Sequence, residues 1–214
     1  MKTTSKLLGI HGLPPRTWAS GLILIIAVLA GPAAAQYPPL SEYLMPREAE
    51  IALARSAAPA NISGRATIKV LTTSGYQVAH EGDNGLVCMV MRGWTAPTYT
   101  PTQFRNLVYD AKVHAPICFD PGAARIVMPY YELRSKLGME GKTPDQMAER
   151  LQAAYVKGEL PRRDAVSFAY MWSADMNLGP GIGHWHPHMI TACHGTWGKS
   201  EQVTRPPAQV PRAP

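Results

Sequence analysis

Residues 66–91 read ATIKVLTTSGYQVAHEGDNGLVCMVM, and this stretch decides the fold class. It holds three short runs rich in β-branched and other apolar residues, at 66–71, 76–80 and 86–91. Runs of this kind, separated by polar turn residues, predict β-strands. Asn84-Gly85, in the second turn, tolerates the positive φ angles of a tight hairpin. We therefore expect the last two runs to pair as a hairpin and all three to form an antiparallel meander.

The residues on either side of the meander add helices. Residues 45–55 place a proline near the first helical position, acidic residues in the first turn and an arginine near the end, which predicts a helix. Farther along, Asp120-Pro121 and the capping-box sequence Thr143-Pro144-Asp145-Gln146 are typical helix starts. A helical middle section is expected over residues 120–158.

Two further runs, at residues 165–172 and 185–192, are expected to be strands that complete the sheet. The predicted fold is α+β, in one domain that covers residues 36–198. Its antiparallel sheet of about five strands comprises the meander and, after the helical section, the two further strands, with helices packed on one face.

The first 35 residues have the order of a secretory signal peptide. Basic residues without acids come first, an apolar run of about 13 residues follows, and Ala33-Ala34-Ala35 suits a cleavage site. The apolar run is shorter than the roughly 20 residues that a membrane span needs. We expect residues 1–35 to be removed, no stable membrane anchor to remain, and the protein to be secreted or periplasmic. Residues 199–214, rich in proline and poor in apolar side chains, are expected to form a disordered tail.

The charge of the chain lies mostly at its ends. Removing both ends takes away six of the 21 Lys and Arg residues and one of the 15 Asp and Glu residues, which leaves residues 36–198 with 15 bases against 14 acids. A nucleic-acid-binding domain needs a basic surface, so this balance predicts no nucleic acid partner.

Three cysteines remain in the expected mature chain: Cys88, Cys118 and Cys193. Exported proteins usually hold paired cysteines as disulfides. Cys88 and Cys118 both lie in short apolar runs, so we expect them to pair and to stabilise the domain by roughly 3.6 kcal/mol through the loop they close. The alternative is that all three are buried thiols. Cys193 has no assigned partner.

Four histidines lie close together near the end of the domain. In an extended segment His184, His186 and His188 point to one side, whereas Trp185 points to the other. Three imidazoles with an open fourth position are the smallest form of a catalytic zinc site, and a copper ion is a further possibility. The alternative is an exposed edge segment without a special task, because Pro187 cannot donate to a ladder of hydrogen bonds.

Two hypotheses for the function follow. No complete catalytic set is visible in the sequence, so the first is an exported, non-catalytic module that binds a small molecule or a protein partner. The second is a metal-binding protein or a metal-dependent hydrolase centred on His184, His186 and His188.

Overall fold

The computed structural model of the chain describes residues 37–95, 109–162, 165–179, 183–184 and 186–192. The chain divides into two compact units, residues 1–34 and 35–214, and every described residue belongs to the second. The predicted signal peptide, the predicted tail, Cys193 and Trp185 lie outside the described residues, so those expectations stay predictions.

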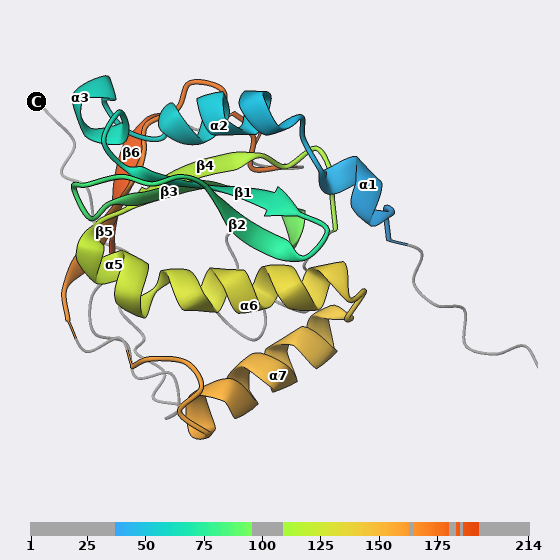
Figure 1. The fold of residues 1–214 in the computed structure, drawn as a ribbon. Helices are drawn as coiled ribbons and strands as arrows, with labels where there is room; N and C mark the ends of the chain where they lie inside the picture. Colours follow the sequence, from blue (N-terminus) through green and yellow to red (C-terminus); the bar gives the residue numbers. More distant parts are fainter. Residues whose placement is uncertain (1–36, 96–108, 163–164, 180–182, 185, 193–214) are drawn as a thin grey trace, which may run out of the picture. The chain divides into compact units, whose positions relative to one another are not determined.

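The second unit is an α+β domain, as expected (Figure 1). Its helices are α1 (Leu40–Tyr43), α2 (Arg47–Arg55), α3 (Ala60–Ser63), the 3-10 helix η1 (Gly93–Thr95), α5 (Pro121–Ile126), α6 (Met128–Met139) and α7 (Pro144–Val156). Its strands are β1 (Thr67–Thr72), β2 (Gly75–His80), β3 (Val87–Met91), β4 (Ala115–Phe119), β5 (Ser167–Met171) and β6 (His188–Ala192). None of the helices in the described ranges is long and apolar enough to cross a membrane.

The six strands form one sheet in the order β2-β1-β3-β4-β5-β6, which corrects the expected five. The strand missed from the sequence is β4, at the centre of the sheet. Pro116 lies within it, and proline is rare inside central strands because it cannot donate to the ladder. Here β5 pairs with Cys118 and Phe119, so among the described residues the β4 backbone at Pro116 has a neighbouring strand on one side only.

The expected hairpin between the second and third runs is wrong. The hairpin lies instead between β1 and β2, with Gly75 at a φ of 108° directly after its turn, and β3 pairs with β1 in parallel. The sheet is therefore mixed rather than purely antiparallel. The connection from β2 to β3 crosses the start of β1, where a Cβ atom on Gly82 would lie 2.3 Å from the backbone of Thr67. Only glycine fits so close to another backbone segment.

Helices cover both faces of the sheet, which corrects the expectation of one face. In Figure 1, α2 lies on one side of the sheet, and α6 and α7 lie on the other. α2 packs on β1, β3 and β4, and α5 packs on β4 and β5. A mixed sheet whose strands carry apolar residues on both sides needs a cover on each.

The predicted helix starts are confirmed. The side chain of Asp120 accepts a hydrogen bond from the Ala123 N–H at the start of α5. Thr143 and Gln146 form the reciprocal capping box at the start of α7. These local signals act within four residues, which is why they can be identified without knowing the tertiary fold.

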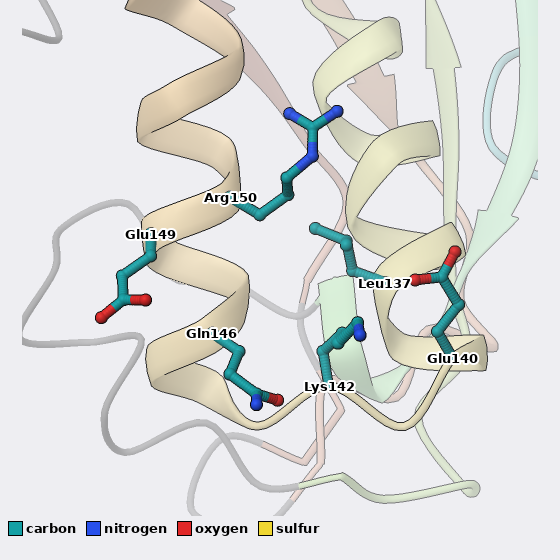
Figure 2. Close-up of a pocket in the computed structure, with 6 residues that line it drawn as sticks. All are labelled: Leu137, Glu140, Lys142, Gln146, Glu149 and Arg150. Carbon is teal, nitrogen blue, oxygen red and sulfur yellow. The ribbon is translucent and has the colours of Figure 1, made fainter.

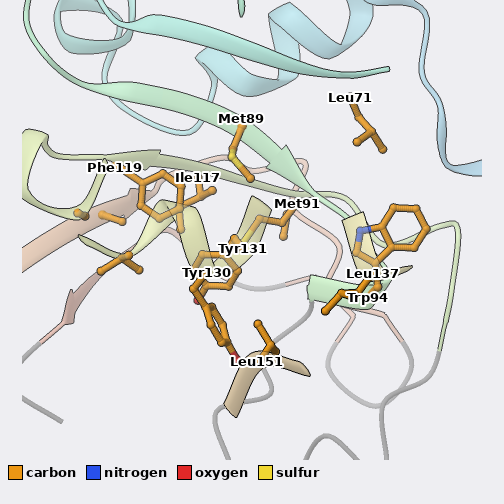
Figure 3. Packing of buried hydrophobic residues seen from close by; sticks show 14 of the residues in the cluster. Leu71, Met89, Met91, Trp94, Ile117, Phe119, Tyr130, Tyr131, Leu137 and Leu151 are labelled. Carbon is orange, nitrogen blue, oxygen red and sulfur yellow. The ribbon is translucent and has the colours of Figure 1, made fainter. Parts of the chain in front are cut away.

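The larger core lies between the sheet and helices α5 to α7 (Figure 3). Met89 and Phe119 project from the sheet, and Tyr131 and Leu151 meet them from α6 and α7. The smaller core lies under α2 and contains Ala54, Ala57, Ile68, Cys88 and Cys118 among others. Cys88 and Cys118 face each other across β3 and β4 and are joined by a disulfide, in agreement with the predicted pair.

A fully buried ion pair ties α2 to the sheet. Arg92 Nη2 lies 2.8 Å from Glu50 Oε2, and neither side chain is exposed. Arg92 also donates to the carbonyl oxygens of Tyr43 and Val90, and the other Glu50 oxygen accepts from the Leu71 N–H. These bonds link α1, α2, β1 and β3, so each charge has partners that offset the cost of its burial.

Candidate functional site

The histidines of the predicted metal site occupy different settings. His188 is the first residue of β6, and its Nδ1 lies 2.9 Å from the carbonyl oxygen of His186. The rings of these two histidines are 6.0 Å apart. His184 lies outside the strand and forms an isolated β-bridge with Asn177.

Asn177 connects His184 to a histidine that the sequence analysis did not single out. Asn177 also forms an antiparallel bridge with His114, through backbone hydrogen bonds of 2.9 and 3.0 Å. Partner residues of an antiparallel bridge project to the same face. His114, Asn177 and His184 therefore lie side by side on one face of three neighbouring backbone segments. Burial, followed by the charge of Arg92, lowers the pKa of His114 below its ordinary 6.5.

Within the described ranges no group of three or more His, Cys, Asp or Glu side chains is arranged to hold a metal ion. The metal site at His184, His186 and His188, whether for zinc or for copper, therefore stays a prediction.

Strands β5 and β6 carry an exposed row of apolar side chains. Along β5 the odd positions Ser167, Ala169 and Met171 are buried, whereas Phe168 and Tyr170 are only half-buried. Alternation along a strand places the two sets on opposite faces. We give the name apolar strip to a set of exposed and half-buried apolar side chains. It consists of Phe168 and Tyr170 of β5, Met189 of β6, and Val166 and Trp172, which directly precede and follow β5.

The strand register supports this assignment. Met189 of β6 pairs with Tyr170, and Tyr170 packs against the smaller core under α2. On the opposite face Ile190 pairs with Ala169; Ala169 belongs to the larger core, and Ile190 packs against it. Phe168 and Tyr170 contact each other edge to face, with ring centroids 5.6 Å apart. Tyr170 therefore lies beside both Phe168 and Met189, and these three side chains form the centre of the strip.

The strip is exposed because of where α2 ends. α2 packs over β1, β3 and β4, and the chain then turns at Ser56 and Ala57. The carbonyl oxygen of Ala57 accepts a hydrogen bond from the Trp172 N–H. Side chains of Val166, Trp172 and Met189 remain 73%, 48% and 49% exposed. Large apolar side chains gathered in this way usually mark a surface that contacts another molecule.

Two open clefts lie elsewhere on the domain. The first, about 510 Å³, lies between α6 and α7 and is shown in Figure 2. Five of its six lining residues are polar or charged; Arg150 and Leu137 lie between the helices, whereas the Glu149 carboxylate points away from α6. Arg150 is already paired with Glu159 at 2.5 Å.

The second cleft, about 570 Å³, lies between α6 and the β1–β2 hairpin. It holds an ion pair between Lys69 and Glu132, with Lys136 and Glu140 nearby and Tyr76 among the less polar residues. Small-molecule sites are mostly apolar with few polar groups. Neither cleft has that character.

Comparisons with protein-family models, with curated proteins and with solved structures found no match for this chain. The function must therefore be inferred from the arrangement of its own residues.

Proposed function

We propose that this chain is an exported, non-catalytic interaction module that binds a polypeptide partner through the apolar strip. The observation that carries the proposal is that exposed and half-buried apolar side chains follow one another on β5, on β6 and directly beside β5. Among the other described residues, the large apolar side chains that are exposed are those of Val78 in β2 and Val156 in α7, which lie in separate elements. Isolated exposed side chains are common on monomers, whereas clustered ones mark contact surfaces.

The chemistry of the strip favours a polypeptide. Tryptophan, tyrosine and methionine are enriched at the centres of protein interfaces, where their large apolar surfaces bind and exclude water. Neither of the two clefts described above is lined by residues of the strip, and a small molecule prefers a concave site. An apolar segment of another protein is therefore the better match for this surface.

The clefts support the same choice. Their walls combine acids and bases that are partly paired with each other, so neither cleft offers a strong net charge to a ligand. No acid, base and nucleophile stand out together in the described residues, and a binding role requires none.

The proposal is tested with the processed full chain and a displayed library of random 12-residue peptides. Peptides selected on the immobilised parent should be rich in aromatic and aliphatic residues, and calorimetry should give their affinities. Val166→Lys combined with Trp172→Gln should weaken binding by about 10-fold or more, since truncating an interface aromatic often costs 2 kcal/mol or more.

Val156→Lys is the matched control. Val156 is as exposed as Val166 but lies in α7, outside the strip, so its replacement should leave peptide affinity unchanged. Selected peptides that bind the strip variant as tightly as the parent, or a failure to select any peptide, would contradict the proposed function.

A further inference from the structure

We infer that Asn84 is a site of spontaneous modification, where the side-chain amide is converted to a carboxylate at a rate set by the opening of α3. This inference is independent of the proposed function, because Asn84 lies in the connection between β2 and β3 and not in the apolar strip. The residue after Asn84, the hydrogen bonds of its side chain and the close packing of the connection support it.

The sequence makes Asn84 the most reactive asparagine of the chain. An asparagine amide is lost when the backbone nitrogen of the next residue attacks the carbonyl carbon of the side chain. Gly85 leaves this approach open, because glycine has no side chain and adopts a wide range of backbone angles. The three other asparagines precede bulky residues, in the pairs Asn61-Ile62, Asn106-Leu107 and Asn177-Leu178.

The reaction needs only water from the solvent. The Gly85 nitrogen forms a bond to Asn84 Cγ, the bond between Cγ and Nδ2 breaks, and ammonia leaves with the proton that the Gly85 nitrogen gives up. Water then opens the cyclic imide. Hydrolysis at Cγ gives aspartate, whereas hydrolysis at the main-chain carbonyl carbon gives isoaspartate, in which the backbone continues through the side chain.

The folded chain holds the Asn84 amide at both ends. Its Nδ2 donates to the carbonyl oxygen of Ile62 at 2.8 Å, and its Oδ1 accepts from the Leu86 N–H at 3.1 Å. The first bond joins the connection to α3, and the second closes a turn across Gly85. Attack makes Cγ tetrahedral and expels Nδ2, so the bond to Ile62 must break before the amide can be lost.

The contact that must open is a small one. α3 spans only Ala60–Ser63, and Ile62 is partly buried where it packs against the smaller core. Asn61 and Gly64 are exposed. Short segments with few buried contacts open at a lower free energy than the whole domain. Separation of α3 from the connection therefore exposes Asn84 to attack without global unfolding.

The product fits this place less well than asparagine does. A carboxylate at position 84 has no hydrogen to donate and places negative charge against the Ile62 carbonyl oxygen. Isoaspartate also lengthens the backbone, close to the crossing where Gly82 has no room for a Cβ atom. We expect the modified protein to hold α3 less firmly and to be less stable than the parent.

The test follows the processed full chain by peptide mapping and mass spectrometry during incubation at mildly alkaline pH. One sample is folded, and a second is unfolded in urea with a reductant. In the unfolded sample Asn84 should be converted before Asn61, Asn106 and Asn177. In the folded sample conversion of Asn84 should be at least about 10-fold slower, which corresponds to an opening free energy of about 1.4 kcal/mol or more.

Two truncations decide whether the opening of α3 sets the rate. Ile62→Ala removes part of the contact between α3 and the smaller core, so this variant should be converted several-fold faster than the parent when both are folded. Leu151→Ala is the control, because it truncates a buried residue of α7 in the larger core and leaves α3 unchanged. Its rate of conversion at Asn84 should equal that of the parent.

The consequence for stability is tested with Asn84→Asp, which carries one of the two products. Its urea midpoint should lie below that of the parent. Asn61→Asp is the matched control, because it adds the same charge at an exposed residue of α3 and should unfold at the midpoint of the parent.

Equal rates at Asn84 in the folded and unfolded chains would overturn the inference, as would earlier conversion of another asparagine in the unfolded chain. Equal acceleration by Ile62→Ala and Leu151→Ala would show that global unfolding sets the rate and would overturn the role assigned to α3. An Asn84→Asp variant as stable as Asn61→Asp would overturn the expected effect on the fold.

Discussion

Replacing Arg92 by methionine tests the buried ion pair directly. Methionine keeps much of the volume of arginine but leaves Glu50 buried without its cationic partner. Breaking a buried pair from one side costs about 3–5 kcal/mol. At 2–4 °C per kcal/mol for a domain of this size, the melting temperature at pH 7 should fall by about 6–20 °C.

The pH dependence of this loss identifies its cause. Burial raises the pKa of Glu50 above its ordinary 4.5, and the charge of Arg92 opposes that shift. Without Arg92 the pKa rises further, so the folded variant binds a proton more tightly than the unfolded chain. Its free energy of unfolding should therefore decrease as the pH rises above about 4.5, and much of the loss at pH 7 should be recovered near pH 5.

Urea unfolding of parent and variant between pH 5 and pH 8 provides the measurement. Arg92→Lys keeps the positive charge, so its free energy of unfolding should fall less than that of Arg92→Met and should depend less on pH. Arg65→Met breaks the Arg65–Asp83 pair, whose side chains are 67% and 69% exposed, and should change stability little. A loss below about 1 kcal/mol for Arg92→Met, or one that does not change with pH, would refute the reasoning.

Three further predictions follow from the same structure. Replacing Cys88 and Cys118 together by alanine opens a link across 30 residues and should lower the free energy of unfolding by about 3.6 kcal/mol in urea; an unchanged midpoint would contradict this. Because burial lowers the pKa of His114, the folded protein loses stability as the pH falls below 6.5. His114→Gln should therefore flatten the pH dependence of the urea midpoint between about pH 5 and 6.5. A curve as steep as that of the parent would contradict this prediction. Elemental analysis of processed chain without a histidine tag should find no stoichiometric zinc or copper, and chelator should leave the melting temperature unchanged. About one metal ion per chain would favour the metal-site alternative instead.

The local features of the fold could be predicted from the sequence. The starts of α5 and α7 depend on side chains within one turn of the helix, at Asp120 and Thr143, and both are observed. The five strands predicted from apolar runs all exist, with small shifts of their ends. The cysteine pair also agrees, because both residues lie in neighbouring apolar strands.

The order of the strands could not be predicted in the same way. Asn84-Gly85 satisfies the local requirements of a hairpin, and Gly85 does adopt a positive φ of 74°. The chain uses that freedom to cross the start of β1 instead, where the Asp83 N–H bonds to the Arg65 carbonyl. Which strand β3 joins depends on long-range packing, to which the turn residues contribute little.

The candidate surface was only partly visible in the sequence. The alternation in residues 165–172 predicts a strand with two different faces, but not which face the rest of the domain covers. That depends on α2 ending at Arg55, before it can extend over β5. The sequence around His184, His186 and His188 likewise gives no sign of His114. His114 comes from a distant part of the chain and is linked to His184 by the β-bridges that both form with Asn177.

The disulfide between β3 and β4 also affects how the chain responds to proteolysis. A protease that cuts a peptide bond between the end of β3 at Met91 and the start of β4 at Ala115 produces two pieces, one carrying β1 to β3 and the other β4 to β6. The disulfide keeps these pieces covalently joined. Such nicked protein would migrate as a single band in non-reducing electrophoresis and separate into two only after reduction.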